Sequence, residues 1–177
     1  LLPTSYVKDA VLMAEDMRKS GFMPKIVMAQ NSGHNDPGFV NKTQLSNYFC
    51  SRSTYADDMT KSVPEIKQYN DFVENKTGVG FNGIYIRSWG GFMTAMKGID
   101  NAGSTDPKEI QKGLNSLTLD RLETGMPYGL KFAKNGQNDQ ASGVLVQFHD
   151  TNSQMIWPFD LAQKDSFTFP APDWSNR

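Results

Sequence analysis

The sequence has few of the residues that carry metal, redox or acid–base chemistry. Its 177 residues include a single cysteine, Cys50, and two histidines, His34 and His149. One cysteine excludes an intrachain disulfide and any CxxC metal or redox site. Two histidines leave little for a histidine-rich metal centre. We therefore expect neither a bound metal nor a cofactor.

The chain also lacks an excess of either charge. It has 18 Lys and Arg against 19 Asp and Glu, a formal net charge of -1 and a pI of about 6.1. Nucleic acids and anionic membranes attract clustered positive charge, so a nucleic-acid partner is not expected. The mean hydropathy is -0.53, and no apolar run approaches the roughly 20 residues that span a bilayer. The length suits one domain, or one and a piece, with a sizeable core.

The first forty residues show an α/β rhythm. Apolar residues spaced three and four apart predict an amphipathic helix over residues 5–20. Gly21 stands where a left-handed cap belongs, and the apolar run 25–29 predicts a buried parallel strand. Asp36 and Pro37 predict the start of a short helix. The opening residues 1–4 resemble the end of a strand that enters a loop, which suggests a chain that begins within a domain.

Further helices are predicted in the middle of the chain. Ser62 and Glu65 have the spacing of a capping box, which predicts a helix that ends near residues 77–78. Residues 84–102 predict the longest helix, and Asp106 begins another that runs to about Ser116. The longest helix carries a stripe of bulky residues that we expect in the core: Tyr85, Trp89, Phe92, Met93, Met96 and Ile99.

After residue 129, the pattern of side chains changes to the two-residue alternation that is typical of β-strands. Residues 130–132 predict a short strand, and 144–149 with 154–157 predict a hairpin, with His149 on the surface. The tail from Pro158 is rich in proline and aromatic residues. We expect it to lie extended over a surface.

Two motifs have chemical readings. Residues 78–83 match GxGxxG, but a helix precedes them where a dinucleotide site needs a strand, so a helix–helix connection is the better interpretation. Loop 30–38 follows a predicted strand, where ligands of open α/β sheets bind. Its neutral donors and acceptors suit hydrogen bonding to a polar small molecule: Gln30, Asn31, Ser32, His34 and Asn35. Alternatively, the loop is merely solvated, or His34 is the general base of an enzyme.

Several segments, in this order, resemble the periplasmic solute-binding proteins of branched-chain amino-acid type ABC transporters. They are residues 5–10, 21–25, 36–40, 101–107, 131–132 with 135–138, 146–147 and 157–162. The resemblance implies two α/β lobes with a type 1 periplasmic-binding fold, a ligand held between them, and lobe closure sensed by a membrane permease. The chain matches the later part of such proteins and is expected to be a fragment that lacks the first lobe.

The resemblance also implies ligand-binding residues. Tyr6 matches an aromatic residue that packs on the ligand, and Asn31, with Ser32 beside it, matches an acidic residue that holds the ligand's amino group. Asn31 is uncharged, which disfavours a standard amino acid and favours an amide, a urea-like compound or an organic acid. Arg87 is a candidate partner for a ligand carboxylate or a member of a surface ion pair. Trp89 lines the cleft or packs in the core.

The predicted fold is thus an α/β, three-layer, parallel-sheet lobe, incomplete, with a C-terminal β-hairpin. Residues 1–80 would belong to the second lobe, 81–118 would form crossing helices that pack with the first lobe, and 119–177 would form the closing strands, hairpin and tail. The predicted function is non-enzymatic capture of a small polar ligand outside the cytoplasm, with self-association of the truncated chain. An open α/β enzyme using His34 and a ligand-sensing receptor domain remain alternatives.

Overall fold

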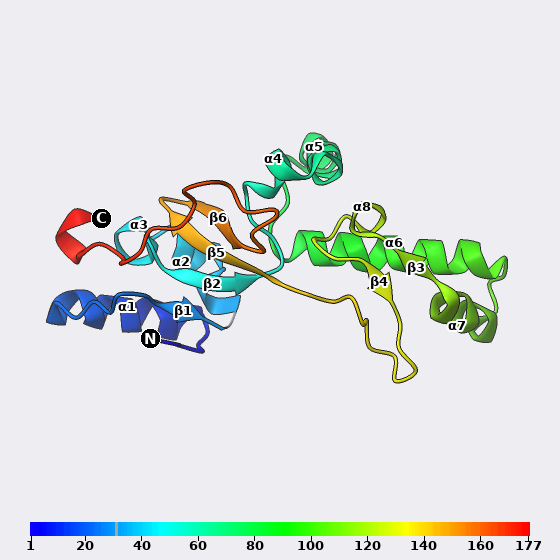
Figure 1. Ribbon diagram of the computed structural model, residues 1–177, viewed down its shortest axis with the longest axis horizontal. Helices are drawn as coiled ribbons and strands as arrows, with labels where there is room; N and C mark the ends of the chain where they lie inside the picture. Colours follow the sequence, from blue (N-terminus) through cyan, green and yellow to red (C-terminus); the bar gives the residue numbers. More distant parts are fainter. Residues whose placement is uncertain (31) are drawn as a thin grey trace. The chain divides into compact units, whose positions relative to one another are not determined.

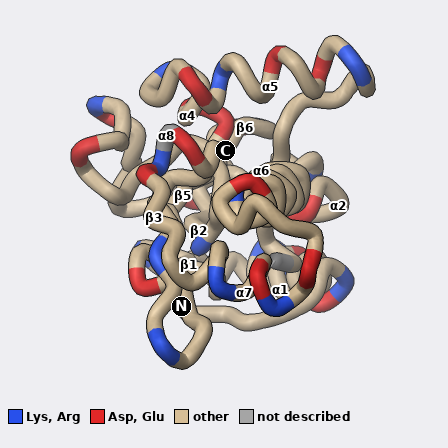
Figure 2. The backbone as a smooth tube through the Cα atoms, turned by 90° about the vertical axis from the view of Figure 1, so that its right-hand side faces the viewer, with Lys and Arg blue, Asp and Glu red and all other residues tan. Residues whose placement is uncertain are grey.

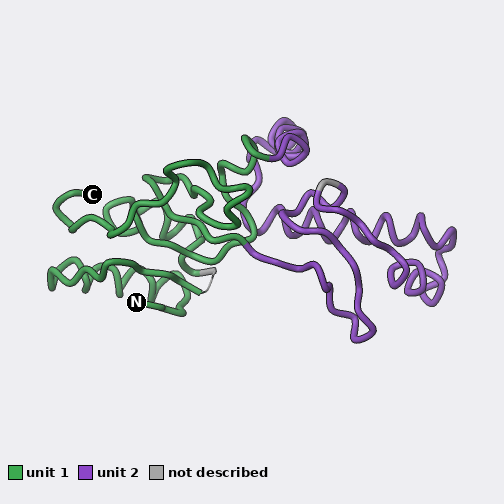
Figure 3. The backbone as a smooth tube through the Cα atoms, viewed as in Figure 1, with its two compact units in different colours: residues 1–62, 144–177 green, residues 63–143 purple. Residues whose placement is uncertain are grey.

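The computed structural model describes residues 1–30 and 32–177, without the side chains of Ser32 and Leu122. The chain divides into two compact units (Figure 3). Unit 1 contains residues 1–62 and 144–177, and unit 2 contains residues 63–143. The predicted division into segments of two lobes concerns a larger protein and stays a prediction.

Unit 1 is built on a four-stranded sheet with the strand order β1-β2-β5-β6 (Figure 1). β1 and β2 are parallel, whereas β2–β5 and β5–β6 are antiparallel. The α/β class and the C-terminal hairpin are confirmed, and so is the parallel pairing of β1 and β2, but the sheet is mixed because the hairpin pairs antiparallel to β2. The unit contains α1 (Val7–Ser20), β1 (Met28–Ala29), η1 (Ser32–His34), α2 (Pro37–Val40), α3 (Thr43–Ser46), β2 (Cys50–Ser53), α4 (Met59–Ser62), β5 (Val144–His149), β6 (Asn152–Trp157) and η2 (Trp174–Asn176).

The first residues of the chain extend this sheet beyond β1. Met28 N donates to Leu1 O at 2.9 Å, and Gln30 N donates to Pro3 O at 3.0 Å. The amino group of Leu1 donates to Ile26 O at 3.0 Å. Residues 1–3 therefore lie along β1 with the hydrogen-bond pattern of a parallel neighbour. These hydrogen bonds agree with the prediction of a strand end, although residues 1–4 form no regular strand.

Helix α1 follows the predicted periodicity. Ala10, Ala14 and Met17 are buried on one face, and Gly21 closes the helix with φ 70°. The helix contacts η1, α2 and α3. Asp36 begins α2 as predicted, because its side chain accepts from Gly38 N at 2.8 Å.

The tail after β6 lies over the sheet as expected, but it is not extended throughout, since it turns after β6 and ends in η2. Gln147 on β5 is 1% exposed, and its amide joins β5 to the tail. Its Nε2 donates to Thr168 O at 3.0 Å and its Oε1 accepts from Thr168 N at 2.7 Å. His149 is half-buried and its Nε2 lies 3.2 Å from Ser166 O. The prediction that His149 is a surface residue is wrong, because the returning tail covers it.

Unit 2 is mainly helical, with a two-stranded antiparallel β3–β4 pair. Asp106 caps its helix as predicted, accepting from Lys108 N and Glu109 N. The capping box at Ser62 is wrong: Val63 is the N-cap of α5, and Ser62 Oγ donates to Leu161 O at 3.1 Å instead. The elements are α5 (Pro64–Thr77), α6 (Tyr85–Ala102), α7 (Pro107–Ser116), β3 (Thr118–Leu119), α8 (Arg121–Thr124) and β4 (Leu130–Lys131).

Helix α6 buries a different face from the one expected. Its buried residues are Ile86, Gly90 and Gly98, and a Cβ on Gly98 would meet the side chain of Leu114 on α7. The core assignment of the bulky stripe is wrong for Tyr85, Phe92, Met96 and Ile99, which are 36–59% exposed. Small residues let α7 approach closely, so they occupy the packed side of α6. Residues 78–83 join α5 to α6, as the helix–helix interpretation predicted.

Candidate functional site

The candidate solute site lies where β1 and β2 end. Because the two strands are parallel, their carboxyl ends meet at one edge of the sheet, the position at which open α/β sheets bind ligands. The loop after β1 is tied to β2 there, since Asn35 Nδ2 donates to Arg52 O at 2.8 Å. The predicted polar loop is thus held against this edge.

Tyr6 and η1 are brought together by a close backbone approach. A Cβ on Gly33 would meet Ser5 O and would lie 2.6 Å from the carbonyl carbon of Tyr6. Only glycine allows this approach. Tyr6 precedes α1 and is 73% exposed. Its ring is therefore available to a solute at a position whose backbone is fixed by η1, which begins at Ser32. Asn31, the other predicted ligand residue here, lies outside the described residues.

The acidic residue of this loop serves as a helix cap. Asp36 is the one acidic residue in the sequence from 30 to 38, and its Oδ1 accepts from Gly38 N at the start of α2. A carboxylate that caps a helix is already engaged by backbone donors. One oxygen of Asp36 is thus used by the fold, and the loop offers mainly neutral donors and acceptors besides it.

His34 does not sit at the surface of this loop. It is completely buried, its ring meets Phe39 edge-on at 5.0 Å between centroids, and neither ring nitrogen has a hydrogen-bond partner among the described residues. Burial lowers the pKa of His34 to about 4. A general base needs contact with substrate and a positioned partner. This environment supplies neither of them, so the enzyme alternative loses its candidate base.

The other two predicted ligand residues lie on α6 in unit 2. Arg87 is exposed and makes no hydrogen bond or ion pair with any described residue. Trp89 is half-buried in an aromatic cluster, with ring centroids 5.2 Å from Tyr69, 6.1 Å from Phe81 and 6.3 Å from Phe72. This packing agrees with the core alternative for Trp89, and its role in ligand binding stays a prediction.

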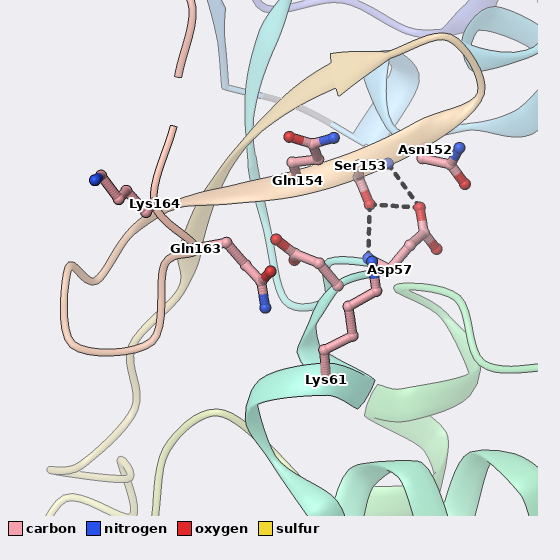
Figure 4. A pocket seen from close by; sticks show the side chains of 8 residues that line it. Asp57, Lys61, Asn152, Ser153, Gln154, Gln163 and Lys164 are labelled. Atoms are coloured by element: carbon pink, nitrogen blue, oxygen red, sulfur yellow. Dashed lines mark hydrogen bonds between the residues drawn. The ribbon is translucent and has the colours of Figure 1, made fainter. Parts of the chain in front are cut away.

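Unit 1 contains a cavity of about 440 Å³ that the sequence does not predict (Figure 4). Asp57 Oδ2 accepts from Ser153 Oγ at 2.8 Å and also from the backbone N–H of Ser153. Asp58 accepts from Met155 N. Both carboxylates therefore cover donors along the outer edge of β6, a structural use that protects an edge strand. Lys61, Gln154 and Gln163 line the remaining space.

The charge distribution and the hydropathy of the helices give no separate indication of function among the described residues. Figure 2 shows basic and acidic residues interspersed along α5 rather than gathered by sign. Among the described residues, no helix has the length and apolar character needed to cross a bilayer. Nor do three His, Cys, Asp or Glu side chains converge on a common point in the described part of the chain.

The comparisons with known proteins point in one direction. No model of a known protein family matches the chain. The chain is 21% identical over 162 residues to Leu/Ile/Val-binding protein homolog 7 of Brucella abortus, covering 89% of this chain and 41% of that protein. It is also 21% identical over 166 residues to homolog 8 of the same species, covering 92% and 41%.

The chain is a distant homologue of the Leu/Ile/Val-binding proteins. Its structure matches the leucine-binding protein LivK of Thermotoga maritima with a TM-score of 0.71 and 17% sequence identity, over 87% of this chain and 42% of that one. The fold is thus matched by that of a type 1 periplasmic-binding-protein lobe. The chain spans about two fifths of the length of the curated homologues that it matches.

Proposed function

We propose that the chain is part of an extracytoplasmic solute-binding protein of an ABC importer. The observation that carries the proposal is its distant homology, over most of its length, to the Leu/Ile/Val-binding proteins. The polar loop at the carboxyl edge of β1 and β2 supports it, because that edge is where such sheets bind ligands. The proposed activity is reversible capture of a solute without bond cleavage.

Tyr6, Asn31 and Ser32 are the proposed ligand-binding residues of unit 1, and Arg87 and Trp89 those of unit 2. Tyr6 would supply an exposed aromatic face, and the loop would supply neutral hydrogen bonds. The uncharged Asn31, at the position where the resemblance implies an acidic residue, favours an amide or an organic acid over a standard amino acid. A neutral carboxamide satisfies both donors and acceptors of such a loop without an ion pair.

The proposed partners are a small solute and a membrane permease. The exposed apolar side of α6, with Phe92 at 59% and Met96 at 48% exposure, also supports self-association of the isolated chain. Light scattering measures this directly. A concentration-dependent rise in mass above 19.8 kDa is expected, and a constant monomer mass would contradict self-association without affecting solute capture.

An NMR titration tests the proposed solute site. The ¹⁵N-labelled chain is titrated to about 10 mM, a range that detects millimolar binding, with leucine, isobutyramide or 3-methylbutanoate. We expect saturable shifts confined to residues 5–8 and the loop 30–38, larger for isobutyramide than for leucine. If none of these solutes shifted the loop while the spectrum remained that of a folded chain, solute capture at this edge would be contradicted.

A further inference from the structure

Unit 2 contains a cavity of about 310 Å³ beside α6. One face of the helix lines it, since Arg87, Gly90, Gly91 and Thr94 stand at the spacings i, i+3, i+4 and i+7. The segment from the end of α8 to β4 lines the other side. The volume lies at the lower end of the range that small-molecule sites occupy.

The floor of this cavity is apolar and fixed. Met126 and Leu130 line it, and they are 5% and 7% exposed. The hydroxyl of Thr124 is already engaged, because it donates at 2.8 Å to Tyr128 O. A ligand would therefore meet buried hydrocarbon on the floor, which suits a compact apolar group.

The two glycines of α6 have different surroundings. A Cβ on Gly90 would lie 2.7 Å from Met126 Cγ, so Gly90 is needed for packing. A Cβ on Gly91 would have no atom within 4 Å. Among the described residues beyond its own helix backbone, none approaches Gly91 this closely, so the space beside the helix there is open to a ligand. This difference also provides a means to fill the cavity without disturbing the core.

The charge at the rim is of one sign. Arg87 carries a guanidinium that makes no ion pair with any described residue, and the described residues that line the cavity include no Asp or Glu. A guanidinium binds a carboxylate with two charge-assisted hydrogen bonds. With no acidic partner at the rim, an ammonium group would be left unpaired beside a cation.

We propose that this cavity binds a small monocarboxylate with a compact apolar tail, its carboxylate on Arg87 and its tail against Met126 and Leu130. The inference shares with the proposed function only the assignment of Arg87 to a ligand carboxylate. It depends neither on the unit 1 site nor on transport. It selects acids that lack an α-amino group, because an α-ammonium has no counter-charge there.

Cyclohexanecarboxylate is the probe, with the neutral cyclohexanecarboxamide as a control of matching shape. In titrations of the ¹⁵N-labelled full chain, the acid should shift the resonances of residues 87–94 and 124–130. The amide should bind at least about tenfold more weakly, because it loses the charge-assisted contact with Arg87. Equal binding of the two probes, or no shift in these residues with the acid, would overturn the proposal.

Three variants locate the site. Arg87→Gln should weaken the acid about tenfold and leave the amide unchanged. Gly91→Leu should block both probes by filling the cavity, whereas Gly91→Ala should keep most of the binding and, by its higher helix propensity, raise the melting temperature. Retained binding in a folded Gly91→Leu variant would place the ligand elsewhere and overturn the inference.

Tyr6→Ala separates this inference from the proposed solute site. Acid binding that survives Tyr6→Ala but not Arg87→Gln supports the unit 2 cavity, whatever the outcome for solutes at the loop. Acid binding that is lost in Tyr6→Ala and kept in Arg87→Gln would overturn the unit 2 cavity and support the unit 1 site.

Discussion

Asp58 accepts the backbone N–H of Met155 through both carboxylate oxygens, at 3.0 and 3.1 Å. Its side chain is 7% exposed. Burial raises the pKa of Asp58 above its usual range, despite its hydrogen bond with Met155. The Asp58 carboxylate therefore stabilises β6 by accepting a hydrogen bond, but burying its negative charge lowers the stability of the folded chain.

Asp58→Ala and Asp58→Asn separate these two roles. Alanine leaves the buried Met155 N–H without an acceptor and should lower the free energy of unfolding by about 1–3 kcal/mol. Asparagine keeps an acceptor and removes the buried charge, so it should be at least as stable as the wild type at neutral pH. Urea denaturation measures both, and a wild-type-like Asp58→Ala would contradict the role of Asp58.

The pH dependence of this pair has a definite sign. The folded pKa of Asp58 is raised, so the folded chain binds its proton more readily than the unfolded chain does. The penalty on the ionised form is present above the folded pKa and disappears as pH falls below the ordinary value of 3.8. The stability difference between Asp58→Asn and wild type should shrink on acidification.

His34 should make the stability of the chain sensitive to acid at a higher pH than Asp58 does. Its folded pKa of about 4 lies below the ordinary 6.5, so the unfolded chain binds the proton more readily. Stability is full above pH 6.5 and falls as pH drops towards 4, by about 3 kcal/mol in total. His34→Leu should flatten this part of the pH profile of unfolding. An unchanged slope between pH 6.5 and 4 would contradict the burial of a neutral imidazole.

Gln147 should hold the tail on the sheet. It makes three hydrogen bonds, two of them with Thr168 and one with Tyr48 O at 3.1 Å. Gln147→Ala should speed hydrogen exchange at the Thr168 amide at least tenfold and lower the free energy of unfolding by about 2–4 kcal/mol. Gln147→Met, similar in length but without the amide, is the matched control: it keeps most of the packing, so it should lose less stability than alanine while exchange at Thr168 stays fast. Unchanged protection of Thr168 in both variants would remove this role from Gln147.

The sequence predicted what depends on neighbours along the chain. The caps at Asp36 and Asp106, and Gly21 after α1, were recognised because their hydrogen bonds or backbone angles involve residues two to four positions away. Ser62 failed for a non-local reason: its hydroxyl donates to Leu161 O, 99 residues away. No local spacing reveals such a competitor.

The direction of the strands and the exposed side of α6 were harder to predict, because they too depend on residues far apart in the sequence. The hairpin turned a sheet expected to be parallel into a mixed one, and Gly98 rather than Phe92 marks the packed side of α6. Of the predicted site residues of unit 1, the resemblance selected Tyr6, Asn31 and Ser32, and the close approach of Gly33 to the backbone of Tyr6 explains why η1 lies beside the start of α1. The cavity beside Gly91 left no signal in the sequence, because lining it needs residues from α6, α8 and β4 at once.

The most direct test of solute capture is the affinity of Tyr6 variants for isobutyramide, measured by the titration of residues 5–8 and 30–38. Tyr6 is 73% exposed, so its replacement should not unfold the chain. We expect Tyr6→Ala to weaken binding about tenfold through loss of the aromatic face, with Tyr6→Phe close to wild type. Equal affinities for wild type and a folded Tyr6→Ala variant would contradict the proposed solute site.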